Sequence, residues 1–366
     1  MHVLITSDTV GGVWTYTQEL VTGLVRGGHR VTLVSFGKLP APHQTAWIDT
    51  LPGLDYRPTE YRLEWMEVAE RDIEESRRYL ELLAKEVEPD ILHFSQYCYG
   101  DIAVDIPKII VAHSDVVSWW FAVHGTEPDD TPWIRRYRQH VMDGLRATDV
   151  VIAPSQWMLD QVAQHYFRPP HGAVIYNGRT PALFDSHLDK EDFVLSVGRM
   201  WDPAKQVQLL LGCPQKMPVS IVGWEREPGK EDEESLLSGL PNVEVTGPKS
   251  QSQLRALYAK AAVYAATSRY EPFGLSPLEA AFSGCALVMN DIAVFHELWG
   301  ESSLYFAKDD SADLRQALEN LQHDRALRRQ FADRAYETAR ARFTAQRMVE
   351  QYEKIYQDVL SLARVA

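Results

Sequence analysis

Residues 265–285 read A-A-T-S-R-Y-E-P-F-G-L-S-P-L-E-A-A-F-S-G-C, and the rest of the chain can be placed around them. The apolar run at 262–266, which overlaps their start, predicts a buried strand. Ser276 suits a helix N-cap, Pro277 suits the first helical position, and Glu279 completes the spacing of a capping box. The stretch is therefore predicted to form a strand, a tight loop and a short helix.

Two carboxylates flank this predicted helix start. Glu271 opens the loop and Glu279 lies in the first turn, eight positions later. The N–H groups that begin a helix have no acceptor within it, and they attract anions. Two interpretations follow: Glu279 caps a helix while Glu271 is solvated, or the two carboxylates border an anion-binding loop.

The totals of the sequence narrow the class of protein. A chain of 366 residues suggests about two domains. A net charge of −14 disfavours a nucleic-acid partner, which requires a basic face. The cysteines show neither a metal-ligand nor a disulfide spacing; they are Cys98, Cys213 and Cys285. Residues 1–6 read as a strand rather than a signal peptide, and no apolar run reaches membrane-spanning length, so we expect a cytoplasmic protein.

The first half alternates between strand and helix patterns. Apolar residues at 3–5 predict a strand, those at 13–24 recur at helical spacing, and 30–34 predict a second strand. This is a βαβ unit whose first corner contains Gly11 and Gly12. The glycines form either a simple tight turn or a place where backbone approaches a phosphate. A long helix is predicted at 64–88, and further strands are predicted at 91–94, 108–112, 149–153 and 173–176.

The strand predicted at 108–112 ends at His113. Ligands of open parallel sheets bind at the carboxyl ends of the strands, so His113 is a candidate site residue, although a structural histidine fits equally well. Asp115 and Trp119 follow and are candidates for contacting an acceptor. Tryptophans here, including Trp120 and Trp133, either fill the core or stack on a sugar or lipid.

The second half repeats the alternation and then ends in a helix of a different kind. Strands are predicted at 193–197, 219–223, 243–246, 262–266 and 286–289, and helices at 311–322 and 324–341. A last helix from 344 has an apolar stripe and is predicted to cross back onto the first domain. We expect domains at 1–180 and 181–343, with the crossover helix at 344–366.

Two basic residues follow the first strand of the second half. Arg199 can grip a phosphate with its fork of donors, and Lys205 adds a point charge six positions later. With the helix start after Gly274, they predict a diphosphate site. The alternative is two unrelated, solvated surface cations.

Taken together, these motifs resemble glycosyltransferase family 4, a retaining group with the GT-B fold. The resemblance is carried by Gly11-Gly12, by Asn177-Gly178, by Gly198-Arg199 with Lys205, and by the segment from Glu271 to Glu279. It implies an α/β chain of two Rossmann-like βαβ domains facing across a cleft, with a C-terminal helix crossing back to the first.

The resemblance also implies a role for each motif residue. Arg199 and Lys205 bind and stabilise the donor diphosphate, and Glu279 holds the ribose. Glu271 lies beside the donor sugar, whose hydroxyls meet N–H groups of Phe273, Gly274 and Leu275. Gly11 and Gly12 let the first-domain loop approach the phosphates, and His113 contacts the donor sugar. The catalytic set is thus Glu271, His113, Arg199 and Lys205.

The chain departs from the family pattern at four loops. Gln206 replaces the usual glycine after the lysine, and Arg179-Thr180 replaces Val-Asp after Asn177-Gly178. Ala293-Val294 replaces a glycine-rich pair, and 222–225 replaces a glycine-rich strand end. These changes bear on the identity of the donor more than on the class of reaction.

The expected activity is retaining transfer of a hexose from a nucleotide diphosphate sugar, such as UDP-glucose or GDP-mannose, to an acceptor hydroxyl. The acceptor is a glycan, a lipid-linked glycan or a small metabolite, and no metal cofactor is expected. The alternatives are a sugar-nucleotide epimerase and a non-catalytic sugar-nucleotide-binding subunit. The acidic helix expected at 64–88 disfavours membrane association.

Overall fold

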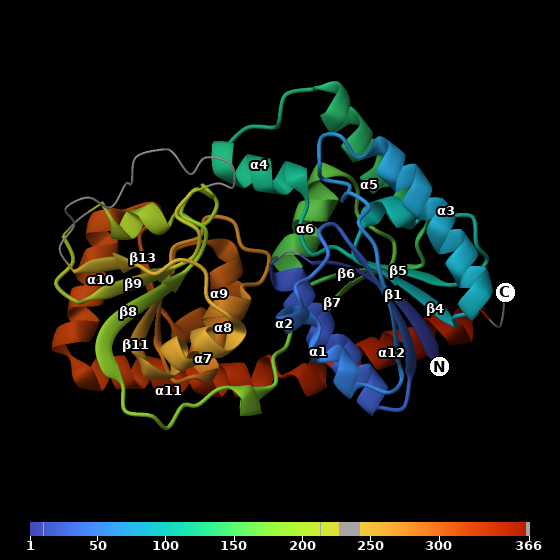
Figure 1. Ribbon diagram of the computed structural model, residues 1–366. Helices are drawn as coiled ribbons and strands as arrows, with labels where there is room; N and C mark the ends of the chain where they lie inside the picture. Colours follow the sequence, from blue (N-terminus) through green and yellow to red (C-terminus); the bar gives the residue numbers. More distant parts are fainter. Residues whose placement is uncertain (10, 213, 227–241, 364–366) are drawn as a thin grey trace. The chain divides into compact units, whose positions relative to one another are not determined.

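The computed structural model describes residues 1–9, 11–212, 214–226 and 242–363, and it divides into two compact units (Figure 1). Unit 1 comprises Met1–Phe121, Thr126–Gly178 and Ala345–Ala366, and unit 2 comprises Ala122–Gly125 and Arg179–Thr344. The main divisions therefore fall after residues 178 and 344, beside the predicted boundaries after 180 and 343.

Unit 1 contains a seven-stranded, fully parallel sheet with the order β3-β2-β1-β4-β5-β6-β7. Parallel strands covered on both faces read as continuous apolar runs, which is why six of the seven segments were recognisable in the sequence, whereas the partly exposed strand at Leu54–Pro58 was not predicted. The strands are β1 (His2–Asp8), β2 (Arg30–Phe36), β3 (Leu54–Pro58), β4 (Ile91–Phe94), β5 (Lys108–Val111), β6 (Val150–Ala153) and β7 (Gly172–Val174). The helices are α1 (Gly12–Arg26), α2 (Pro42–Thr45), α3 (Glu70–Val87), α4 (Val116–His124, of which residues 122–124 belong to unit 2), α5 (Pro132–Ala147) and α6 (Gln156–His165), joined by α12 (Ala345–Ala363).

The last helix, α12, belongs to unit 1 and packs against α1, which crosses it in the view of Figure 1. Its apolar stripe shares a core with α1 and the sheet. The approach is close at Gly23, where an added Cβ would lie 2.3 Å from a methyl group of Val349. The predicted return of the C-terminal helix to the first domain is therefore confirmed.

Helix α3 is shorter than the helix predicted at 64–88, since it begins at Glu70. Glu64 is buried, and its two carboxylate oxygens accept hydrogen bonds from the N–H groups of Tyr97 (2.9 Å) and Cys98 (2.7 Å). These bonds hold the segment before Glu70 against the loop after β4 and remove it from the helix. Burial also raises the pKa of Glu64.

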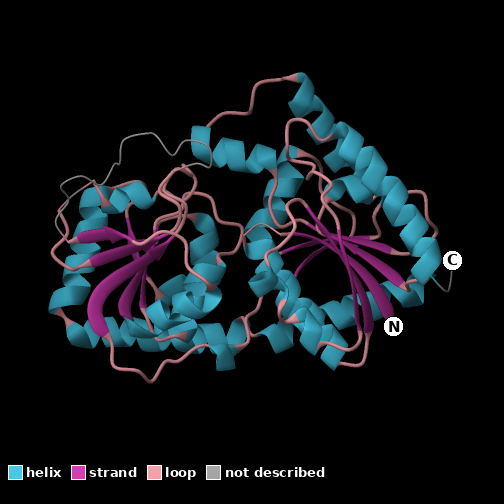
Figure 2. Ribbon diagram, in the orientation of Figure 1, coloured by secondary structure: helices cyan, strands magenta, loops and turns pink. Residues whose placement is uncertain are grey.

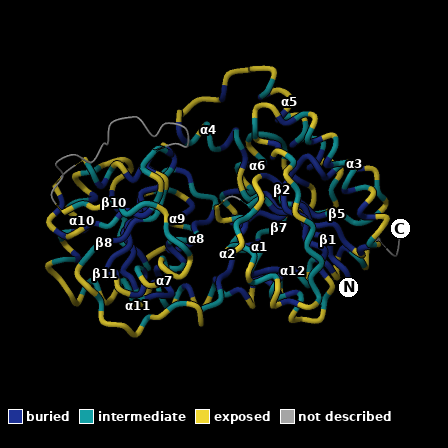
Figure 3. Tube along the Cα trace, in the orientation of Figure 1, coloured by how far each residue is buried: buried dark blue, intermediate teal, exposed yellow. Residues whose placement is uncertain are grey.

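Unit 2 contains a six-stranded, fully parallel sheet with the order β10-β9-β8-β11-β12-β13. In both units, helices cover the strands (Figure 2), and most exposed residues lie on loops and outer helix faces (Figure 3). The strands are β8 (Glu191–Val197), β9 (Val219–Val222), β10 (Val243–Val245), β11 (Ala261–Ala266), β12 (Ala286–Asn290) and β13 (Leu304–Phe306). The helices are α7 (Gln251–Lys260), α8 (Leu275–Phe282), α9 (Ala293–Trp299), α10 (Ser311–His323) and α11 (Arg325–Arg342).

The predicted capping box at the start of α8 is wrong. The helix begins at Leu275, and its N-cap is Gly274 in a left-handed conformation (φ 91°), with no side-chain cap. Ser276 and Pro277 lie inside the first turn. Glu279 is paired with Arg179 instead of the helix start, so its side chain is not available as a cap.

Candidate active site

The loops after β8 and β9 are held together where two glycines meet. Gly198 donates its N–H to the carbonyl of Val222 at 2.9 Å, which extends the pairing of the two strands beyond their ends. A Cβ on Gly223, whose φ is 152°, would lie 2.0 Å from the carbonyl oxygen of Gly198. Only glycine fits there, and the contact fixes the backbone that carries Arg199.

Lys205 and Glu271 are in direct contact, although 66 positions separate them. The ammonium of Lys205 lies 2.6 Å from Glu271 Oε2, and the hydroxyl of Ser268 donates to the same oxygen at 3.2 Å. The Lys205 carbonyl accepts a bond from the hydroxyl of Thr267, just past β11, at 2.8 Å. The side chains retain 27% and 15% exposure, so this pair can still meet a ligand.

Arg199 is positioned by a carboxylate that sequence reasoning missed. Its guanidinium lies 2.5 Å from Asp202 Oδ2 and 5.0 Å from the ring centre of Trp201. Asp202 is buried, and its other oxygen accepts from the N–H of Ala204. Arg199 stays 44% exposed, so a diphosphate can reach it. The three-residue spacing between Arg199 and Asp202 was the available signal.

Glu279 forms a buried ion pair with Arg179, the residue noted above as a departure from the family pattern. Arg179 Nε lies 2.9 Å from Glu279 Oε1, and the two side chains are 2% and 13% exposed. The guanidinium lies 5.4 Å from the ring centre of Phe184. The Arg179 N–H donates to the carbonyl of Phe343, which ties the start of unit 2 to its end.

The loop between Glu271 and α8 is tight because of Gly274. An added Cβ there would lie 3.2 Å from Cγ of Glu271 and 3.4 Å from the ring of Pro277. Phe273 is buried with its ring against Phe343, at 5.4 Å between ring centres. Its side chain is thus an anchor. The N–H groups of Leu275 and Ser276 open the helix, where helices commonly bind anions.

His113 follows β5 in unit 1 and is kept neutral. Its Nε2 lies 3.4 Å from the hydroxyl of Ser95, and its ring meets Tyr16 edge-on at 4.5 Å between ring centres. Burial lowers its pKa to about 3. At neutral pH, His113 therefore offers a hydrogen-bonding ring and no positive charge.

Asp115 serves as a helix cap. One of its oxygens accepts from the N–H groups of Val117 and Ser118, each at 2.9 Å, at the start of α4, and from the hydroxyl of Tyr166 at 3.0 Å. The buried carboxylate is occupied by these bonds, which gives no support to acceptor binding. Trp119 lies on α4, with its ring 6.4 Å from that of Trp120.

Gly11 supports the predicted turn before α1. Its φ is 64°, and an added Cβ would meet no atom within 4 Å, so backbone conformation rather than crowding favours glycine. Gly12 is exposed and opens α1. The role proposed for both, close approach to a phosphate, stays a prediction.

Among the described ranges, no three His, Cys, Asp or Glu side chains are grouped as a metal site. Within the same residues, no helix is long and apolar enough to cross a bilayer.

Two family models match the chain. Glycosyltransferase Family 4 matches residues 10–182, and Glycosyl transferases group 1 matches residues 191–324. The chain belongs to glycosyltransferase family 4. Since the two matches meet near the division between the units, each unit corresponds to one half of the family pattern.

Several curated relatives of this family 4 chain are mannosyltransferases. The O-antigen chain mannosyltransferase RfbU of Salmonella typhimurium is 27% identical over 47% of this chain and half of its own length. An uncharacterised glycosyltransferase of Methanocaldococcus jannaschii, MJ1607, is 25% identical over 79% of each chain. The chain thus matches only half of the Salmonella protein.

Solved structures confirm the GT-B fold. Sucrose-phosphate synthase from Thermosynechococcus elongatus superposes with a TM-score of 0.78 at 15% identity, covering 99% of this chain and all of the other. Anabaena HepE, solved with UDP, gives a TM-score of 0.74 at 18% identity over 98% and 100% of the two chains. At these identities the likeness extends to the fold alone.

Proposed function

We propose that the protein is a retaining glycosyltransferase that moves a hexose from a nucleotide diphosphate sugar to an acceptor hydroxyl. The observation that carries the proposal is the contact of Lys205 with Glu271 in the loop that opens α8. This arrangement combines a cation, a carboxylate and helix N–H groups. A cation and N–H donors suit a leaving phosphate, and a carboxylate suits the hydroxyls of a sugar.

In the proposed step, the bond between the anomeric carbon and the phosphate oxygen breaks, and its electron pair stays on the diphosphate. The acceptor oxygen forms a bond to the same face of that carbon, and its proton passes to the departing phosphate oxygen. Lys205, Arg199 and the first N–H groups of α8 stabilise the negative charge that develops. Glu271 orients the donor sugar, and the neutral ring of His113 binds it without competing for the phosphate charge.

For the donor, we propose a mannose nucleotide first, because several curated relatives are named mannosyltransferases. UDP-glucose is the second candidate, since HepE was solved in complex with it. Glu279 would hold the ribose diol, and Arg179, whose Nε lies 2.9 Å from Glu279 Oε1, would fix the carboxylate in place.

The test combines ligand binding with turnover. The melting temperature of the full chain is measured with GDP-mannose, UDP-glucose and ADP-glucose, because a ligand that binds only the folded state raises it. The stabilising donor is then incubated with and without oligosaccharide acceptors, in the presence and absence of EDTA. We expect acceptor-dependent, EDTA-insensitive release of the nucleoside diphosphate. Epimerised sugar formed without acceptor would contradict transfer and support an epimerase.

A further inference from the structure

A cavity in unit 1 lies apart from the residues assigned above. Its volume is about 440 Å³, within the range of small-molecule sites, and it lies among the segment before α3, α4 and the start of α5. Two tryptophans line it: Trp120 from α4 and Trp133 from α5. Both tryptophans are partly exposed, so neither is fully buried in the core.

Trp133 has a polar group that lacks a partner. Its indole N–H is buried and donates to no acceptor among the residues that the structure describes. Buried indole N–H groups usually find a partner, and one without a partner beside a cavity is completed by a ligand hydroxyl or by water. Trp133 also lines the cavity, so a donor without a partner lies on a residue of the cavity wall, beside the aromatic surface.

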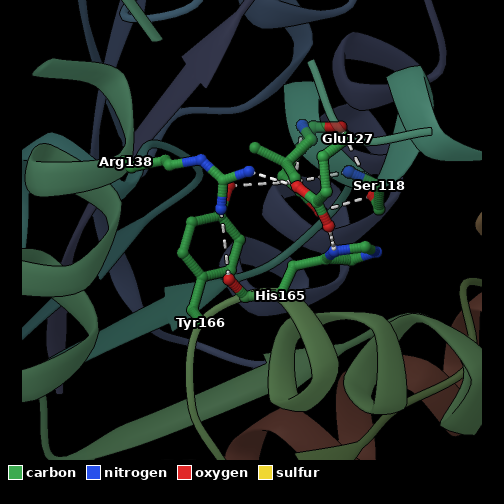
Figure 4. Close-up of polar contacts among 7 residues, drawn as sticks. Ser118, Glu127, Arg138, His165 and Tyr166 are labelled. Atoms are coloured by element: carbon green, nitrogen blue, oxygen red, sulfur yellow. Dashed lines mark hydrogen bonds and ion pairs between the residues drawn. The ribbon is translucent and has the colours of Figure 1, made fainter. Parts of the chain in front are cut away.

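The wall of the cavity is held in a fixed shape. The carboxylate of Glu127 pairs with the guanidinium of Arg138, and it lies 3.0 Å from Nδ1 of His165 (Figure 4). The hydroxyl of Thr131 accepts from the N–H of Ile134 at 3.2 Å and caps α5. The segment between these two anchors contributes Pro128 and other residues to the lining. A preformed wall lowers the cost of ordering on binding.

The rim of the cavity is polar and mainly acidic. Glu67 and Asp129 are exposed carboxylates, while the guanidinium of Arg136 is paired with Glu70. Unpaired carboxylates repel an anionic ligand, and a charged rim does not suit an alkyl chain. Carboxylates do accept hydrogen bonds from hydroxyl groups. Aromatic faces, one indole N–H and carboxylates together match a sugar ring, which has an apolar face and hydroxyls at its edge.

We propose that this cavity binds a sugar ring of a glycan acceptor. The ring stacks on Trp120 or Trp133, and its hydroxyls bond to Glu67, Asp129 and the Trp133 indole. Calling the ligand an acceptor rests on the proposed glycosyltransferase function; the binding of a sugar does not. Helix α4, which lines the cavity, begins three positions after His113, so one continuous segment of the chain carries both His113 and a wall of the cavity.

The experiment uses the full chain with mannotriose and maltotriose as probes. Saturation-transfer NMR and tryptophan fluorescence titration measure binding without donor, and turnover gives the KM values for acceptor and donor. Trp133→Ala and Trp120→Ala are compared with the wild type. Trp133→Phe keeps a ring but removes the N–H, which covers the case of an alanine variant that fails to fold. Trp224→Ala, which removes an exposed tryptophan of unit 2, is the control.

We expect at least a tenfold weaker Kd for the trisaccharide in both alanine variants and an intermediate value for Trp133→Phe. The donor KM should be unchanged, and Trp224→Ala should bind the trisaccharide normally. The proposal is overturned if neither trisaccharide binds, if the cavity variants bind as the wild type does, or if an alkyl detergent displaces the sugar. If the protein binds the sugar but shows no turnover, the proposed function is wrong and the assignment of this cavity stands. If the protein shows turnover and Trp133→Ala leaves the acceptor KM unchanged, the proposed function stands and the assignment of this cavity is wrong.

Discussion

The carboxyl edges of the two sheets differ in chemistry. The ion pairs at this edge of unit 2 include those of Lys205 with Glu271, Arg199 with Asp202 and Arg179 with Glu279. In unit 1 two buried histidines lie near the corresponding edge and are neutral. His93 and His113 both have pKa values of about 3, and burial raises the pKa of Tyr16 well above its usual range.

The difference indicates a division of work within the chain. Under the proposed function, fixed charges stabilise a leaving group that carries charge, and unit 2 would supply them. Neutral hydrogen-bonding groups suit sugar hydroxyls, which carry no charge. The predictions below test this contrast, from the largest expected effect to the smallest.

The buried pair in unit 2 should have the largest effect on stability. Arg179→Met leaves the Glu279 carboxylate buried without its cation, and breaking a buried pair in this way costs about 3–5 kcal/mol. Urea unfolding measures the loss. The double variant with Glu279→Gln removes the orphaned charge and should recover most of it, while the donor KM stays raised. A single variant as stable as the wild type would show that the pair is not a structural element.

Lys205 should have the largest effect on turnover. In the proposed step, Lys205→Ala would remove a fixed cation from the departing diphosphate, and the loss of one such group costs about 10²–10³ in kcat. Lys216→Ala is the matched control, because Lys216 also pairs with a glutamate, Glu319, but on the exposed surface of unit 2. Steady-state kinetics of both variants decide the point. If Lys205→Ala and Lys216→Ala have the same kcat, Lys205 does not take part in the reaction.

The neutral edge of unit 1 should respond to acid. His93 lies between Tyr356 of α12, at 2.7 Å, and Tyr16 of α1, at 3.3 Å, and burial holds its pKa near 3, against 6.5 in the unfolded chain. Between these values only the unfolded chain takes up the proton, so stability falls as the pH drops below 6.5. At pH 5.5 the loss from His93 is about 1.4 kcal/mol.

The variant His93→Asn isolates this contribution. Asparagine keeps a polar group facing Tyr356 and cannot take up the proton, so its own loss between pH 7.5 and 5.5 should be about 1.4 kcal/mol smaller than that of the wild type. His113 contributes in the same direction in both chains and cancels in the difference. Urea unfolding of the wild type and the variant at the two pH values measures this difference in stability loss. Identical losses would mean that His93 is not held neutral by the fold.

The sequence predicted more of the fold than of the contacts in the site. The alternation of apolar runs and helical patterns predicted most strands of both parallel sheets, because strands covered on both faces need apolar side chains throughout. The less buried edge strands β3 and β13 were missed. The sequence wrongly placed Glu64 in a helix. Its position in a helical pattern does not reveal that two N–H groups after β4 require its carboxylate as an acceptor. Such long-range hydrogen bonds override the structure that the local sequence pattern favours.

The site shows the same limit. The sequence predicted that Lys205 and the loop after Glu271 lie at one site, because the ends of neighbouring parallel strands meet at one edge, but it did not predict their direct ion pair. The partner of Glu279 did not follow, because Arg179 reaches it from the boundary between the units, and only a folded chain brings the two together. The helix cap failed for a related reason: Ser276 has the right side chain, but the left-handed Gly274 already starts the helix.

The smallest expected effect lies next to Lys205 and concerns backbone strain at the charged edge. Gln206 adopts a left-handed conformation (φ 46°), which costs a non-glycine residue about 1 kcal/mol or more, and its amide oxygen lies 3.4 Å from Nδ2 of Asn290. Gln206→Gly relieves the strain but adds freedom to the unfolded chain and loses that contact. We expect a net stabilisation of about 0.5 kcal/mol, measured by urea unfolding, with kcat unchanged. A destabilised variant would mean that the contact with Asn290 outweighs the strain, so that the glutamine is held in this loop by its side chain.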